Sequence, residues 1–207
     1  FNGWYTKAGA PVTVTANQAT FVMPAADVTL YGSWTQNNYT VTYAWDGTAP
    51  SAATLPAPLT NKHYNDPITL AARPTEPGWT FNGWYTKTGS LVTVVSSDSS
   101  FTMPDGDVTL YGKWTMIDYT VIYINWNDAV LQGPTTVHIG DTIPAYTGNT
   151  PTKPDVNGVR YTFTGTWALT GTEGPNGTVG TSNLVYKAIY SEAFIDYTVS
   201  YSWDGTA

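Results

Sequence analysis

The chain has 207 residues and a formal net charge of −7, and only 11% of its residues are charged, well below the roughly 25% of typical soluble domains. Its eight Lys and Arg residues argue against binding to nucleic acid or to anionic membrane surfaces, because both need clustered basic side chains. It contains no cysteine, which excludes a disulfide framework and a thiolate metal site. No apolar run is long enough to span a bilayer, so no membrane insertion of this segment is expected.

The first seven residues, Phe-Asn-Gly-Trp-Tyr-Thr-Lys, return unchanged at 81–87. Residues 1–35 align with 81–115 at a constant offset of 80 without a gap, and 22 of the 35 positions are identical. Both copies end on Asp-Val-Thr-Leu-Tyr-Gly followed by a Trp-Thr pair. A repeat at a fixed period is the sequence signature of an array of small structural units.

The other half of the period repeats as well. YTVTYAWDGTA at 39–49 returns as YTVSYSWDGTA at 197–207, and a looser version begins at Tyr119. The predicted boundaries therefore divide the chain into the C-terminal part of a repeat (1–35), a complete repeat (36–115), a complete divergent repeat (116–193) and the N-terminal part of a further repeat (194–207). We expect the chain to be a window on a longer array, with neighbouring residues or a neighbouring chain covering the strand edges of the partial units.

Within the complete repeat the predicted elements are short strands. Residues 39–45 alternate between aromatic or Val side chains and smaller ones, which is the period of a strand. Further strands are predicted at 60–64, 68–71, 79–86 and 108–114, with turns at Asp46-Gly47, Asn65–Pro67 and Asp105-Gly106. Gly83 inside a strand predicts a bulge or a close backbone approach. No segment has a helical period, so the fold class is mainly β, in units of about 80 residues.

Aromatic side chains dominate the predicted core, because they recur at matching strand positions. The core and repeat signature comprises Phe81, Gly83, Trp84, Met103, Leu110 and Trp114, with Phe163 and Trp167 as counterparts in 116–193. Three other tryptophans, Trp45, Trp79 and Trp203, are candidates for a contact surface, since exposed aromatic rings can stack on sugars or anchor a protein partner. Packing against an adjoining repeat is the alternative for these three.

The sequence contains no motif for catalysis, a cofactor or a metal. The two histidines, His63 and His138, occupy matching positions in successive repeats, but each has only one nearby aspartate in sequence, whereas a metal site needs three or four ligands. The run Asp105-Gly106-Asp107 fits a turn better than a calcium loop. Isopeptide cross-links at Lys7, Lys87, Lys113 or Lys187 stay open, since no spacing singles one of them out.

Two motifs together resemble the internalin-type B repeat, also called the Listeria–Bacteroides repeat: Gly78–Trp84 and Met103–Trp114. The resemblance covers 36–115 and the partial units, and it weakens in 116–193, where Gly-rich sequence around 171–182 replaces the Met-Pro segment. It implies a β-grasp-like (ubiquitin-like) sheet. It also implies a large exported bacterial surface protein, often anchored to the cell wall, without catalytic residues.

The predicted function is that of a non-catalytic structural and interaction module, an extracellular stalk or fibre built as an elongated rod of tandem repeats. The alternative is an adhesin that binds a glycan or host protein directly through exposed aromatic residues or strand edges. The expected partners are adjacent repeats or neighbouring copies of the same chain, with a glycan or host surface protein under the alternative.

Overall fold

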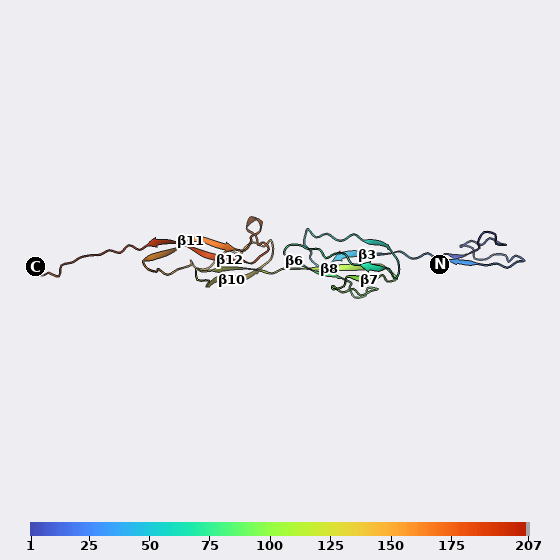
Figure 1. Cartoon of the computed structure of the whole chain (residues 1–207), viewed down its shortest axis with the longest axis horizontal. Coiled ribbons are helices and arrows are strands. Elements are labelled where there is room, and N and C mark those ends of the chain that lie inside the picture. The colour runs from blue at the N-terminus through green and yellow to red at the C-terminus, as the bar shows by residue number, and fades with distance from the viewer. Residues whose placement is uncertain (206–207) are drawn as a thin grey trace. The chain divides into compact units, whose positions relative to one another are not determined.

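A computed structural model describes residues 1–205, and within that range the regular structure is almost entirely β (Figure 1). The mainly β prediction is confirmed, since one 3-10 turn (Pro175–Gly177) is the single helical element of the described residues. The predicted segment 194–207 includes 206 and 207, which lie outside the described residues. The described chain contains no helix long and apolar enough to cross a bilayer.

The strands in chain order are β1 (Gly3–Tyr5), β2 (Tyr31–Ser33), β3 (Tyr39–Trp45), β4 (Leu59–Lys62), β5 (Pro67–Thr69), β6 (Trp79–Tyr85), β7 (Ser100–Thr102), β8 (Val108–Met116), β9 (Tyr119–Ile124), β10 (Val130–Val137), β11 (Val159–Thr170) and β12 (Leu184–Phe194). Strand β7 was not expected, because Ser-Phe-Thr is too short to show a period. It pairs with β5 in a separate two-stranded sheet.

The chain divides into two compact units. One comprises residues 1–49, 54–73 and 82–113, and the other comprises 50–53, 74–81 and 114–207. The repeat boundaries at 36, 116 and 194 stay a prediction.

Residues 36–116 contain a four-stranded sheet in the order β4-β3-β8-β6. Its first strand, β3, lies between β4, which is antiparallel to it, and β8, which is parallel to it. In the parallel pair, Val41 lies opposite Val108 and Tyr43 opposite Leu110. The first and last strands of this repeat are therefore central neighbours, so the sheet forms only when both ends of the repeat are present.

Residues 119–194 repeat this strand order as β10-β9-β12-β11, again with the first and last strands parallel. Tyr123 lies opposite Tyr186 at the position where Tyr43 faces Leu110. The two halves of this segment thus keep the pairing scheme of 36–116 although most of their residues differ.

Trp84 is the centre of the first core. Its side chain is 2% exposed, and the ring lies 4.9 Å from Tyr43 in an edge-on contact and 5.4 Å from Trp45 in a stacked contact. Such aromatic pairs add specific geometry to a large buried apolar area. The other predicted members, Phe81, Met103, Leu110 and Trp114, are also buried.

Tyr123 is the centre of the second core. Its ring packs edge-on against Trp167 at 4.9 Å and stacks on Tyr186 at 4.9 Å. Trp167 and Phe163 contact each other at 5.2 Å and are half-buried, unlike their fully buried counterparts in 36–115.

The Gly-rich replacement around 171–182 preserves one anchor of the repeat. Met103 exchanges two backbone hydrogen bonds with the preceding turn: its N–H donates to the Asp66 carbonyl at 2.9 Å, and its carbonyl accepts from the Asn65 N–H at 3.0 Å. Val179 makes the same pair with Asp141 and Gly140, at 2.8 and 2.9 Å, and is equally buried. Sequence comparison misses this equivalence, because residues 179–184 are identical to residues 103–108 at no position.

Candidate functional site

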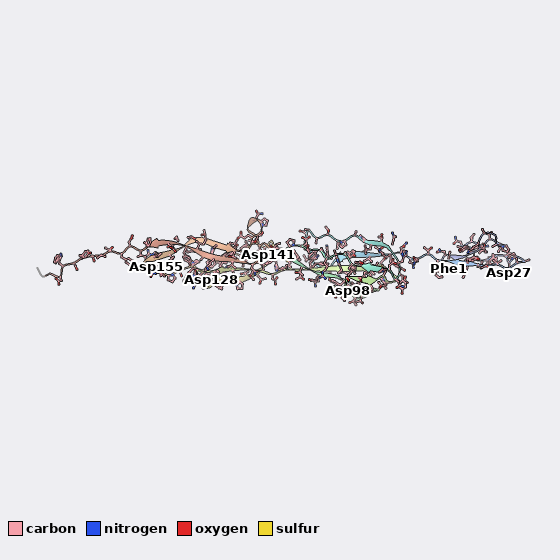
Figure 2. The ribbon with its side chains drawn as sticks, in the orientation of Figure 1. Phe1, Asp27, Asp98, Asp128, Asp141 and Asp155 are labelled. Carbon is pink, nitrogen blue, oxygen red and sulfur yellow. The ribbon has the colours of Figure 1, made fainter. Side chains whose placement is uncertain are left out.

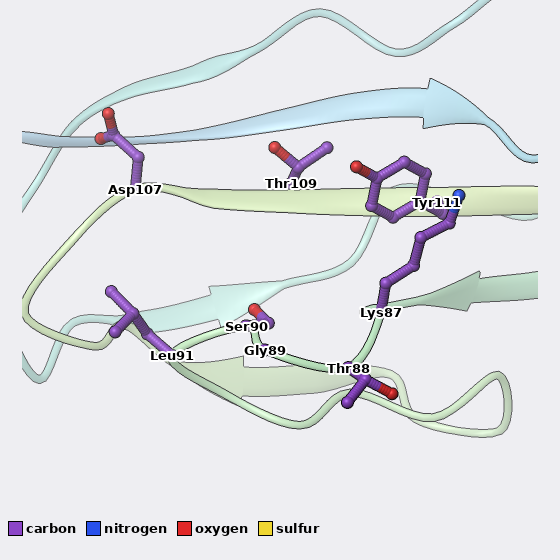
Figure 3. A pocket seen from close by; sticks show the side chains of 8 residues that line it. All are labelled: Lys87, Thr88, Gly89, Ser90, Leu91, Asp107, Thr109 and Tyr111. Carbon is purple, nitrogen blue, oxygen red and sulfur yellow. The ribbon is translucent and has the colours of Figure 1, made fainter.

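A shallow pocket of about 300 Å³ lies beside the outer face of β8 (Figure 3). Thr109 and Tyr111 lie on β8, and the Lys87 side chain extends from the loop that follows β6 toward the Tyr111 ring. The lining residues are Lys87, Thr88, Gly89, Ser90, Leu91, Asp107, Thr109 and Tyr111. The pocket is therefore mainly polar, with one cation, one anion and several hydroxyl groups.

Thr86 shapes the loop that holds this pocket. Its hydroxyl donates to the Val92 carbonyl at 3.0 Å and accepts from the Val94 N–H at 2.9 Å. A side-chain hydroxyl thus closes the loop from Lys87 onward, a local use for which Thr is well suited. Val94, at the end of the loop, is buried and ties it to the core.

The Lys87 ammonium is held in place by an ion pair and by an aromatic ring. Its ammonium lies 2.8 Å from Asp46 Oδ1 and 4.1 Å from the centre of the Tyr111 ring. The hydrogen bonds from Lys87 and Tyr85 lower the pKa of Asp46, and Asp46 in turn raises the pKa of Lys87. Burial, followed by the hydrogen bond to the Asp46 carboxylate, raises the pKa of Tyr85 to about 12.

This ion pair bears on the isopeptide alternative. An amide bond between Lys87 and Asp46 would need a neutral amine attacking a protonated carboxyl group. The pKa shifts in the pair go in the opposite direction and favour the ammonium and the carboxylate. The arrangement is that of a salt bridge, and so is the contact of Lys187 with Asp128 at 2.7 Å.

The same arrangement recurs 80 residues earlier in the chain. The Lys7 ammonium lies 4.1 Å from the centre of the Tyr31 ring, as Lys87 does from Tyr111. The Thr6 hydroxyl donates to the Val12 carbonyl and accepts from the Val14 N–H, both at 2.9 Å. The Lys–Tyr contact and the Thr-closed loop are thus both repeated along the chain.

Two other polar groups of the pocket contact strand β3. Asp107 accepts the Thr40 N–H at 2.7 Å, and the Thr109 hydroxyl lies 3.1 Å from that of Thr42. Both groups are thus engaged with the neighbouring strand β3. The site can offer hydrogen bonds to a hydroxyl-rich or peptide ligand.

Both histidines lie in turns. The backbone N–H of His63 donates to Asp66 Oδ2 at 2.7 Å, and that of His138 donates to Asp141 Oδ2 at 2.8 Å. The aspartates therefore cap the turns. Asp105 likewise accepts a hydrogen bond from the Tyr39 hydroxyl.

Figure 2 labels Asp27, Asp98, Asp128, Asp141 and Asp155, which lie at separate places along the chain. The described residues contain no group of three or more His, Cys, Asp or Glu side chains that could hold a metal ion.

The three predicted contact tryptophans have different environments. Trp45 stacks on Trp84 and is half-buried, so part of its surface belongs to the core. Trp79, at the start of β6, is also half-buried. Trp203 is 95% exposed. The Lys87–Tyr111 pocket was not predicted, although the conserved offset between the Lys7/Tyr31 and Lys87/Tyr111 pairs was visible in the repeat.

Tyr85 supplies a pH prediction. Because folding raises its pKa from 10.0 to about 12, the stability that it contributes is fully present below pH 10 and is lost as the pH rises through 12. We expect one tyrosine to titrate near 12 in ¹³C-ζ NMR spectra, and the Tyr85→Phe variant should lack that signal. In the Asp46→Asn variant the midpoint should fall but stay above 10, since burial is the larger cause. An unchanged set of midpoints in Tyr85→Phe would contradict the assignment.

Comparison with known proteins places these features in context. Residues 39–113 match the Listeria-Bacteroides repeat domain, and residues 1–38 match the divergent InlB B-repeat domain. Internalin H of Listeria monocytogenes serovar 1/2a (strain ATCC BAA-679 / EGD-e) is 35% identical over 120 residues, which cover 57% of this chain and 19% of that protein. The chain thus spans about a fifth of the length of this relative.

A solved structure of Streptococcal High Identity Repeats in Tandem (SHIRT) domains 3-4 from a cell surface protein aligns with 75% of this chain and 99% of that one. Its sequence identity is 14% and its TM-score 0.28, values too low to support an argument about this fold. The repeat-family matches are the informative ones, because they fall on the segments that carry both motifs. Through residues 1–38 and 39–113, this chain belongs to the internalin-type B-repeat family of Listeria–Bacteroides repeats.

Proposed function

We propose that the chain is a non-catalytic structural and interaction module of a large exported bacterial surface protein, and that its repeats form a stalk or extracellular fibre. The observation that carries this proposal is the preservation of one architecture through sequence divergence. Residues 119–194 keep the strand order of 36–116, and Val179 takes over the paired hydrogen bonds of Met103. When the strand order is kept while most side chains change, the backbone architecture is the feature that the function requires.

The strand order also supports a β-grasp-like unit. In such a unit the first and last strands are parallel central neighbours, and each is flanked by an antiparallel hairpin partner. The order β4-β3-β8-β6 fits this arrangement. Because the two terminal strands of each repeat pair with each other, a pulling force applied at both ends would shear their hydrogen bonds together, which suits a stalk.

The proposal places the module outside the bacterial cell. The match to the Listeria-Bacteroides repeat domain and the 35% identity to Internalin H support this location. The acidic composition and the absence of cysteine are compatible with it.

A second candidate is direct adhesion to a glycan or host protein. The recurrence of the Lys–Tyr contact at Lys7/Tyr31 and Lys87/Tyr111 favours it, because repeated weak sites gain affinity through multivalency. Trp79, half-buried at the start of β6, is a separate candidate for an aromatic contact surface.

One set of measurements on the whole chain separates the two candidates. A stalk should give an elongated particle in small-angle scattering and no saturable binding on glycan and protein arrays. A compact scattering profile would contradict the stalk. Saturable binding that weakens in Thr109→Lys or Trp79→Ala, with unchanged circular dichroism, would establish adhesion instead.

A further inference from the structure

A second pocket, of about 390 Å³, lies beside strands β6 and β8. We call it the Lys113 pocket, and the side chains that matter for its chemistry are those of Tyr85, Thr93, Val95, Ser96 and Lys113. All residues that line it fall within 82–113, inside the complete repeat and inside one compact unit. Its surroundings are therefore described in full.

The Lys113 pocket and the Lys87–Tyr111 pocket lie on one face of strand β8. Thr109, Tyr111 and Lys113 alternate with buried residues along the strand, so their side chains project to the same side of the sheet. The first two line the Lys87–Tyr111 pocket, and the third lines the Lys113 pocket. At about 3.3 Å per residue, Thr109 and Lys113 are about 13 Å apart along the strand. A ligand that fills both pockets is therefore linear and has more than one unit.

Lys113 has no carboxylate partner in the described chain. Within residues 1–205, no Asp or Glu oxygen lies at ion-pair distance from its ammonium. Asp46 is already occupied, because its Oδ1 pairs with the Lys87 ammonium at 2.8 Å and its Oδ2 accepts the Tyr85 hydroxyl. The Lys113 ammonium is thus available to an anion from outside the chain.

The walls of the Lys113 pocket combine apolar and polar groups. Val95 is 50% exposed and Tyr85 is half-buried, so both offer apolar surface to a ligand. Thr93 and Ser96 add hydroxyl groups. Ligand sites typically combine such apolar surface with a few polar groups and one charge. The matching ligand has an apolar ring face, several hydroxyl groups and a carboxylate, which describes an acidic sugar.

An extended peptide fits this site less well. Such peptides usually bind a sheet by adding a strand to its open edge. The edge of β6 is covered here, because the Thr86 N–H donates to the Val94 carbonyl at 3.0 Å, and a Cβ at Gly83 would lie 2.3 Å from the Ser96 carbonyl oxygen. Recognition at this site therefore depends on side chains.

We propose that the Lys113 pocket binds the carboxylated sugar of a linear glycan, and that the rest of the glycan extends along β8 into the Lys87–Tyr111 pocket. Charge sets the direction of the ligand. The Lys113 ammonium attracts the carboxylate, whereas the Asp107 carboxylate in the other pocket repels it and can accept hydroxyl groups. The net charge of −7 disfavours a polyanion, so the ligand carries few carboxylates.

This inference rests on the second candidate function, adhesion, and names its ligand class. It concerns the complete repeat in particular, because Lys113 has Ser33 as its counterpart 80 residues earlier. The Lys–Tyr contact is thus repeated, whereas the additional cation is not.

NMR titration of the ¹⁵N-labelled whole chain tests the proposal with pairs of acidic and neutral sugars. Sialyllactose is compared with lactose, and tetragalacturonate with its methyl ester. In at least one pair the acidic sugar should bind about fivefold more tightly, the upper range for an exposed ion pair. Lys113→Gln should abolish this preference. Lys62→Gln, which removes the same charge from β4 of the same sheet, should keep it.

The shifted amides locate the ligand. Sialyllactose should shift amides of both 88–91 and 93–96, whereas the methyl glycoside of N-acetylneuraminic acid, a single sugar, should shift only those of 93–96. A preference for acidic sugars that survives Lys113→Gln would refute the proposal. Equally tight binding of a tetraglutamate peptide would show that the ligand is an acidic peptide and would also overturn it.

The same titrations separate this inference from adhesion in general. If lactose shifts the amides of 88–91 and neither acidic sugar binds more tightly than its neutral partner, adhesion stands and the acidic ligand is wrong. If no sugar causes a shift up to about 10 mM, beyond the weak millimolar range, both glycan adhesion and the acidic ligand are wrong.

Discussion

Replacing Trp84 by alanine should unfold the sheet of residues 36–116 or leave it barely stable. Trp84 is 2% exposed and contacts both Tyr43 and Trp45. Truncation of a buried tryptophan leaves a cavity and costs about 3–5 kcal/mol, which is comparable to the whole stability of a domain of this size. Hydrogen exchange of the β3 and β8 amides should accelerate by a factor of about 10²–10⁴.

The chain provides a matched control in the same seven-residue motif. Trp4 has the same neighbours in sequence but is 55% exposed. Trp4→Ala should therefore leave the exchange rates of β3 and β8 unchanged. If both substitutions slowed or accelerated exchange equally, the core assignment of Trp84 would be wrong.

This pair of tryptophans also illustrates what sequence can predict. The alternation in 39–45 and the recurrence of FNGWYTK predicted strands and a set of core residues in 36–115, because both predictions depend on local period and repeat alignment. The burial of Trp84 against Trp45, however, requires β3 and β8 to be neighbours across almost 70 residues of chain. No local pattern encodes that pairing.

The candidate site also combines a feature that the sequence can predict with one that depends on the fold. The Lys7/Tyr31 and Lys87/Tyr111 pairs can be read from the offset of 80, but their contacts depend on the loop that Thr86 closes and on the adjacency of β6 and β8. Strand β7 and the equivalence of Val179 to Met103 were missed for a related reason. Both depend on backbone hydrogen bonds, which place few demands on residue type.

Gly83→Ala should be nearly as damaging as the loss of Trp84, although it adds only one methyl group. Gly83 has a φ of +112°, which L side chains rarely adopt, and a Cβ there would lie 2.3 Å from the Ser96 carbonyl oxygen. The strand and the 96–99 segment approach so closely that one must move, and the strain and overpacking together cost about 3 kcal/mol. Gly3 repeats this geometry, with a Cβ that would lie 2.0 Å from the Ala16 oxygen.

Gly89 separates the cost of backbone strain from the cost of the steric clash. Its φ is also positive, at +91°, but a Cβ there meets no atom within 4 Å. Gly89→Ala should therefore cost only about 1 kcal/mol from backbone strain, whereas Gly83→Ala adds the clash with Ser96. Hydrogen exchange of the β6 and β8 amides would measure the difference. Equal protection in the two variants would mean that the 96–99 segment moves away freely, and that the close approach at Gly83 does not hold the repeat together.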